Sequence, residues 1–333
     1  MRAIFFTIAL LLTLFGKSQT SAIKLLTTPL KTNYRGLCVV NKNVIWASGS
    51  NGQVSKSTDG GKTWETFTVA GFEKADFRDI YAFSKKEAVV IVIGEGGNIL
   101  RTSDGGKSWQ KVYENNAPGM FLDALDFRNK KEGIVVGDPI NNQFFIAITK
   151  DGGKSWQIDA SFECEAVPQK GEAFFAASGS NILLGKNDYT MVSGGAASRL
   201  LTKTSAIELP LTNGDASIGA NALAINPRTK TIVIVGGDYA KKEERKWNCA
   251  IIKKGLARAV KEADSPSGYR SGIAFISKKS FVACGLNGVD ISQDDGQHWQ
   301  NISKESYNVV VASPNGKAIF LAGSEGKIAR LYP

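Results

Sequence analysis

The stretch STDGGKTW at residues 57–64 decides the fold, because the chain repeats it as TSDGGKSW at 102–109, TKDGGKSW at 149–156 and SQDDGQHW at 292–299. We call each copy a box. Its aspartate can accept hydrogen bonds from backbone N–H groups a few residues further on, and its glycines suit the positive φ of a tight hairpin. Its tryptophan adds apolar surface where the hairpin ends.

We therefore predict that the boxes are structural turns. One carboxylate per hairpin is a poor metal site, so we expect no metal there and no cofactor elsewhere. The residues given this structural role are Asp59, Gly61, Trp64, Asp104, Gly106, Trp109, Asp151, Gly153, Trp156, Asp294, Gly296 and Trp299.

The spacing of the box tryptophans gives the repeat length. Trp64, Trp109 and Trp156 are 45 and 47 residues apart, and Trp299 follows after 143 more. The last interval is about three repeats long, so two further units whose boxes have decayed are expected near positions 204 and 252. Four short strands per unit of this length are typical of a β-propeller blade.

Seven apolar stretches resemble first strands of such units, among them EAFFAAS at 172–178, which NILLG at 181–185 follows as a second strand. The last unit, ending in GKIARLYP, has no room for a fourth strand. The strand-like AIKLLTTPL at 22–30 can supply it and so close the ring, which removes unpaired sheet edges. We predict an all-β, seven-bladed propeller forming one domain over residues 23–333.

Residues 1–22 differ from the rest of the chain. Arg2 precedes a thirteen-residue apolar run, AIFFTIALLLTLF, and small and polar residues follow it. This is typical of a secretory signal peptide, with cleavage after Ser18 or Ala22, and the run is too short to span a bilayer. We expect an exported protein, periplasmic or secreted, without a membrane span once the signal is removed.

Charge and cysteine content narrow the function further. The net charge of +10 comes from scattered lysines, not from a basic stripe interleaved with aromatics, so nucleic-acid binding is not expected. The cysteines Cys38, Cys164, Cys249 and Cys284 match no zinc spacing. We interpret them as structural free thiols, because a domain of this size does not need disulfides.

The boxes resemble the Asp-box, or BNR repeat, of sialidases and related propellers. The longer phrase IGEGGNILRTSDGGKSW at 93–109 more closely resembles the photosystem II stability and assembly factor family, and DFRDI, GGDY and GYRSG are similar to its exported bacterial branch. The resemblance spans nearly the whole chain after the signal. It implies seven blades, boxes on the outer part of each blade, and a non-catalytic protein that binds a partner through an arginine-containing patch.

In a propeller the face opposite the box hairpins carries the mouth of the central channel, which is the usual binding site. We therefore look for polar residues in the connections on that face. The candidate binding residues are Arg35, Arg78, Asp79, Asp123, Asp138, Glu172, Asp238, Tyr239, Tyr269 and Arg270, with Asn221 and Asn308 at equivalent points. Arg35, Arg78 and Arg270 are expected around one mouth, where planar guanidinium groups could take a carboxylate. Rim charges that only satisfy one another remain the alternative.

Two functions fit these residues. The first is a binding or assembly factor, a monomer that engages a cell-envelope protein or an anionic or carbohydrate ligand. The second is a sialidase-like exo-glycosidase, in which Tyr269 or Tyr239 would pair with Glu172 as nucleophile and Asp79 would act as acid and base. Against the second, YRGL at 34–37 lacks the Ile-Pro of the sialidase arginine motif, and sialidases have six blades.

Overall fold

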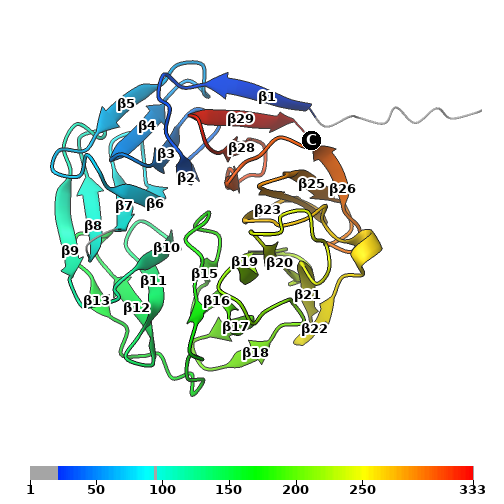
Figure 1. Cartoon of the computed structure of the whole chain (residues 1–333). Coiled ribbons are helices and arrows are strands. Elements are labelled where there is room, and N and C mark those ends of the chain that lie inside the picture. The colour runs from blue at the N-terminus through cyan, green and yellow to red at the C-terminus, as the bar shows by residue number, and fades with distance from the viewer. Residues whose placement is uncertain (1–21, 94–95, 333) are drawn as a thin grey trace, which may run out of the picture.

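A computed structural model describes residues 22–93 and 96–332, and within them strands surround a central axis as a ring of sheets (Figure 1). The described residues include one short 3₁₀ turn, η1 (Glu262–Asp264), beside the strands. The β-propeller fold is confirmed. Residues 1–21 of the expected signal segment, which was predicted over residues 1–22, lie outside the described residues. In the described part of the chain, no helix has the length and apolar character needed to cross a membrane.

Five four-stranded sheets make up most of the ring. In hydrogen-bonded order they are β2 (Tyr34–Val39), β3 (Ile45–Gly49), β4 (Gln53–Ser57) and β5 (Glu65–Thr68); β6 (Asp76–Ala82), β7 (Ala88–Ile93), β8 (Gly97–Thr102) and β9 (Gln110–Asn115); β10 (Leu122–Phe127), β11 (Gly133–Ile140), β12 (Gln143–Thr149) and β13 (Gln157–Ile158); β23 (Gly272–Ser277), β24 (Ser280–Gly285), β25 (Gly288–Ser292) and β26 (Gln300–Ser303); and β1 (Ala22–Thr27), β29 (Lys327–Tyr332), β28 (Ile319–Ala322) and β27 (Val309–Ala312).

The remaining strands form one nine-stranded sheet. They are β14 (Glu172–Ala173), β15 (Ile182–Leu184), β16 (Tyr189–Gly195), β17 (Arg199–Thr202), β18 (Ala206–Glu208), β19 (Ile218–Ile225), β20 (Ile232–Asp238), β21 (Cys249–Lys253) and β22 (Leu256–Ala259). Only the pair Gly194–Gly219 joins β16 to β19.

The hydrophobic core lies between neighbouring sheets. The described residues form seven apolar clusters, and one of them separates the two parts of the nine-stranded sheet, with Val192 on β16 packed towards Ile234 on β20. The count of seven blades stays a prediction, because the strands pair into five four-stranded sheets and one nine-stranded sheet.

The ring closes as predicted, because β1 pairs antiparallel with β29 over all six of its residues. Leu26 of β1 also packs into the cluster between the first and last sheets. The two ends of the described chain therefore complete one four-stranded sheet together, which closes the ring (Figure 1).

The boxes occupy the connections between third and fourth strands, after β4, β8, β12 and β25. The two decayed boxes also have their turns where the spacing places them, at 203–205 between β17 and β18 and at 254–255 between β21 and β22.

One part of the strand assignment was wrong. The stretch 172–178 is not a first strand, because only Glu172 and Ala173 pair, as β14. The innermost strand is β15, within the stretch expected to be second, and the second strand is β16. Both β14 and β15 pair with β16, and residues 174–181 between them leave the sheet. Figure 1 shows a loop beside β15 reaching the centre of the ring.

Candidate functional site: the arginine mouth

Bulges in the innermost strands aim side chains at the channel. In β2, β6, β10 and β19 the register with the second strand shifts by one residue near the start. The extra residues are Arg35, Arg78, Asp123 and Asn221. A bulge leaves one residue out of the ladder and redirects its side chain, which explains why polar residues are found at these positions in otherwise apolar strands.

A cavity of about 560 Å³ lies at one end of the channel and one of about 410 Å³ at the other. The smaller cavity, which we call the arginine mouth, is lined by five of the predicted residues, Arg35, Arg78, Asp138, Tyr239 and Tyr269. Asn221 and Asn308 line it as well.

The two arginines carry more donors than the protein uses. Arg78 pairs with Asp76 at 3.0 Å (Nη2 to Oδ2), and its Nη1 donates to the backbone oxygen of Ala176 at 3.3 Å. The Nε atoms of Arg78 and Arg35 are buried without a hydrogen-bond partner. Burial, and then the like charge of Arg35, lower the pKa of Arg78 from its usual value. Arg35 forms no ion pair with any described residue. Two close guanidinium groups with spare donors favour an anion between them.

Two carboxyl groups lie beside Arg78. Asp138 accepts a hydrogen bond from the backbone N–H of Phe174 at 2.9 Å, and burial raises its pKa to about 6. Asp123, although predicted as a binding residue, is fully buried and is not among the residues that line the mouth. Burial, and then the carboxylate of Asp138, raise the pKa of Asp123 well above its usual value. At neutral pH these two acids are therefore less negative than two free carboxylates would be, and they neutralise less of the positive charge of the arginines.

The tyrosines form an aromatic wall. Tyr269 is buried, and its hydroxyl donates to Oδ1 of Asn221 at 2.7 Å. Burial raises the pKa of this hydroxyl. Tyr239 is 46% exposed and stands edge-on to the rings of Tyr269 and Phe175, with centroids 6.2 and 6.4 Å away. An exposed ring held by two others can contact a ligand with little loss of side-chain entropy.

Arg270 does not line the mouth, against expectation. It is fully buried in an ion pair with Asp290, in which Nε and Oδ2 are 2.6 Å apart. Its Nη1 also donates to the backbone oxygen of Tyr269 and to Oδ1 of Asn287. Its two neighbours in the chain, Tyr269 and Ser271, line the mouth instead. A shift of one residue turns a side chain to the opposite side of a strand.

Three predicted acids also lie elsewhere. Glu172 is buried and forms an ion pair with Arg199, and Ser193 donates to it at 2.5 Å. Asp238 is buried and accepts from the backbone N–H of Ala240 at 2.8 Å. Asp79 lines the larger cavity and accepts from the backbone N–H groups of Ile80 and Leu125. All three satisfy local backbone or side-chain groups.

Segment 174–181 was missed as part of the site. Residues 174–177 line the arginine mouth and residues 178–180 line the larger cavity, so the segment separates the two. It is held by Arg78 at Ala176, by Ser178 Oγ on the backbone oxygen of Ser271 at 2.6 Å, and by Leu223 N–H on the oxygen of Ser180 at 2.8 Å. Phe121 and Leu286 also line the mouth. These residues are apolar or small and none of them is charged, so they did not stand out in the sequence.

The boxes have the hydrogen bonds expected of structural turns. Oδ1 of Asp59 accepts from the backbone N–H groups of Lys62 and Thr63, and Oδ2 accepts from the Thr63 hydroxyl at 2.6 Å. In the last copy His298 Nδ1 takes the place of that hydroxyl, 2.5 Å from Asp294. All four cysteines are free. No group of three or more His, Cys, Asp or Glu in the described ranges is arranged to hold a metal ion.

The fold and the channel define the class of this protein as a β-propeller. A structure described as "YCF48 bound to D1 peptide" matches it with a TM-score of 0.67 and 17% identity, covering 96% of both chains. YCF48 from Cyanidioschyzon merolae matches with a TM-score of 0.64 and 18% identity, covering 94% of this chain and 99% of that one. The WD40 propeller domain of Doa1 matches with a TM-score of 0.62 and 14% identity, covering 93% of this chain and 97% of that one.

At these low sequence identities, the TM-scores show a shared fold and nothing further. A family model, "Sortilin-Vps10: Sortilin, neurotensin receptor 3", matches residues 52–193. No curated protein sequence gives a significant match.

Proposed function

We propose that this protein binds an anionic segment of a partner protein in the arginine mouth and acts as a non-catalytic binding or assembly factor. The observation that carries this proposal is the pair Arg35 and Arg78, which share one cavity with buried, unused Nε donors. A carboxylate from a partner would satisfy these donors and neutralise the like charges.

The surroundings of the pair favour a peptide over a free small anion. Tyr239, Tyr269 and Phe175 provide an aromatic wall beside the arginines, and the amides of Asn221 and Asn308 line the same cavity. Exposed aromatic and arginine side chains are the groups that most often dominate protein–protein binding energy. YCF48, which shares the fold, has been solved with a D1 peptide, and this supports a peptide ligand for a propeller of this kind. We place this function outside the cytoplasm, because residues 1–22 read as a signal peptide.

The glycosidase alternative gains no support from the geometry. Its tyrosine nucleophile would need Glu172, which is held by Arg199 and Ser193 away from the mouth. Its acid and base, Asp79, lines the other cavity. The hydroxyl of Tyr269 is engaged by Asn221, and its raised pKa disfavours the phenolate.

An array of synthetic peptides tests the proposal. Each sequence is presented in an acidic form and in a form with Asn and Gln in place of Asp and Glu. We expect the protein to select acidic peptides, and the Arg35→Ala/Arg78→Ala variant to lose that selection. Arg228→Ala removes one exposed guanidinium from the turn between β19 and β20 and serves as the control. Equal binding of both peptide forms, or unchanged selection by the double variant, would refute the proposal.

A further inference from the structure

The larger cavity, of about 560 Å³, lies on the opposite side of segment 174–181 from the arginine mouth. Its walls come from the innermost strands β2, β6, β10, β15, β19, β23 and β27 and from segment 178–180. Most lining residues are aliphatic, and three are aromatic, Tyr81, Phe83 and Phe275. A volume of this size with apolar walls can hold a small organic molecule.

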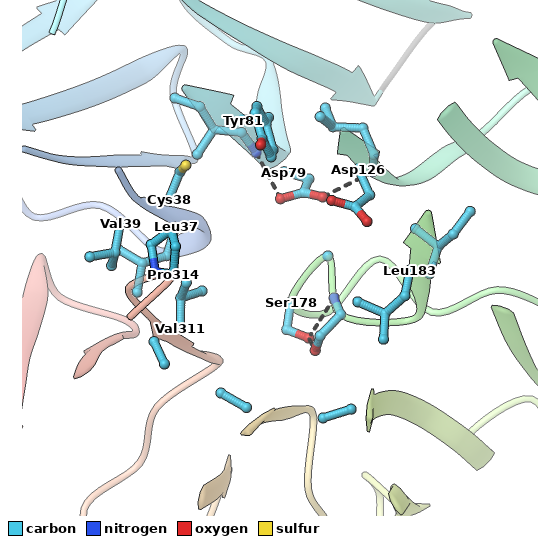
Figure 2. A pocket seen from close by; sticks show the side chains of 18 of the residues that line it. Leu37, Cys38, Val39, Asp79, Tyr81, Asp126, Ser178, Leu183, Val311 and Pro314 are labelled. Atoms are coloured by element: carbon cyan, nitrogen blue, oxygen red, sulfur yellow. Dashed lines mark hydrogen bonds between the residues drawn. The ribbon is translucent and has the colours of Figure 1, made fainter. Parts of the chain in front are cut away.

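One wall of this cavity carries two carboxyl groups. Figure 2 shows Asp79 and Asp126 reaching towards each other from β6 and β10. Asp79 is 5% exposed, whereas Asp126 keeps a partly accessible surface facing the cavity. Each carboxylate accepts two backbone N–H bonds, Asp79 from Ile80 and Leu125 and Asp126 from Phe127 and Leu184. These bonds fix the orientation of both carboxylates, and because the donors are neutral backbone groups they do not balance the negative charge.

The charged and titratable groups around the pair are few. Cys38 on β2 and Tyr81 on β6 are neutral neighbours, and burial raises the pKa of both groups. Lys130, exposed in the turn after β10, is the cation among the lining residues. The lining residues from segment 178–180 and from β15, β19, β23 and β27 carry no titratable side chain. Neither Asp79 nor Asp126 is in a salt bridge with a described residue.

We propose that this cavity is a second binding site, which takes a small organic cation with an apolar body. The ammonium group would lie between the carboxylates of Asp79 and Asp126, and the body would contact the aromatic and aliphatic walls. A cation there gains from both charges in a weakly solvated space, and aromatic faces add attraction. The site is independent of the arginine mouth and does not rest on the function proposed for it.

Binding of n-hexylammonium, n-hexanol and hexanoate, followed by calorimetry between pH 5.5 and 8.5, tests this proposal. Burial raises the pKa of Asp79 to about 8 and that of Asp126 to about 6. Both acids therefore become protonated across this range as pH falls, while the alkylammonium stays charged. We expect hexylammonium to bind at least about tenfold more tightly than hexanol at pH 8.5, and to lose that advantage at pH 5.5.

Two variants of the cavity and one control variant test whether the cavity itself binds the cation. Asp79→Asn should remove most of the pH dependence, and Asp215→Asn, an exposed aspartate in the connection after β18, should leave it unchanged. Because Asp79 also holds backbone groups, Leu183→Trp is the second test: it fills the cavity from a half-buried position and should abolish binding. The proposal would be overturned if hexanol and hexylammonium bound with equal affinity at pH 8.5, or if hexanoate bound more tightly than hexylammonium. It would also be overturned if none of the three compounds bound.

Discussion

Arg35 and Arg270 carry the same guanidinium group in different surroundings. Arg35 occupies a bulge in β2 and faces the mouth with a spare donor. Arg270 precedes β23, and Asp290, Asn287 and a backbone oxygen hold it inside the ring. A buried charge that loses its partner is strongly destabilising, whereas a half-exposed charge can return to water.

Arg270→Ala should therefore lower the free energy of unfolding by about 3–5 kcal/mol, because Asp290 is left buried without its cation. Arg35→Ala should change it by less than about 1 kcal/mol, because Arg35 has no ion-pair partner in the described chain. Urea denaturation followed by tryptophan fluorescence measures both. Similar losses of unfolding free energy in the two variants would contradict a structural role for Arg270 and a binding role for Arg35.

The box aspartates predict a pH dependence of stability. Hydrogen bonds from the Thr63 hydroxyl and the Thr63 N–H lower the pKa of Asp59 to about 2. A depressed pKa in the folded state means that the stabilisation is complete above about pH 4 and is lost as pH falls through about 2. The urea midpoint of Asp59→Ala should lie below that of the wild type at pH 6, and the gap should close towards pH 2. A gap that does not depend on pH would point to packing instead.

At the scale of elements, segment 174–181 forms the wall between the arginine mouth and the larger cavity. Gly179 within it has φ +69°, and a Cβ there would stand 2.3 Å from the Asp79 carboxyl carbon. Gly71 has φ +80° with open space around it. The two glycines share a left-handed backbone and differ in their surroundings, which makes them a matched pair.

Gly71→Ala should destabilise by about 1 kcal/mol, from backbone strain alone. Gly179→Ala should destabilise by at least about 2 kcal/mol, because the segment or Asp79 must also move. The same displacement should weaken peptide binding in the mouth, since Ala176 bonds Arg78. Denaturation and peptide titration measure both effects. Equal destabilisation by the two substitutions would mean that the segment yields freely.

The repeat made the strand pattern predictable, and the site only partly so. Box spacing located even the turns at 203–205 and 254–255, because a blade has a fixed length. The arginine mouth includes Arg35 and Arg78, which were found because each lies near the start of a recognisable apolar strand. Arg270 was misplaced because the repeat spacing does not reveal to which side a side chain points just before β23 begins. The stretch 172–178 was read as a first strand because it is apolar, but residues 174–177 line the arginine mouth and form no strand.

At the scale of the whole molecule, the ring presents two different cavities. The mouth with Arg35 and Arg78 is suited to anions, and the cavity with Asp79 and Asp126 is suited to cations. Segment 174–181 lies between them, so the two ligands would approach from opposite faces of the ring.

The mouth should bind acidic peptides more tightly at lower pH. Asp138, with its pKa raised to about 6 by burial, loses its negative charge as pH falls from 7.5 to 5.5, while peptide carboxylates stay largely ionised. We expect affinity to rise several-fold, roughly three- to tenfold, and Asp138→Asn to show the tighter binding at both pH values. Fluorescence anisotropy at constant ionic strength measures this. Weaker binding at pH 5.5 would place the peptide away from Asp138.

The most direct test of the account is the affinity of an array-selected acidic peptide for the wild type, for Arg35→Ala/Arg78→Ala and for Arg228→Ala, measured by calorimetry at the same salt concentration. Each charge-assisted hydrogen bond lost should weaken binding by about 1.5–3 kcal/mol, or roughly ten- to a hundredfold. The account predicts at least a hundredfold loss in the double variant and less than a twofold change in Arg228→Ala. Equal losses in both variants would show that general positive charge, and not the arginine mouth, binds the partner.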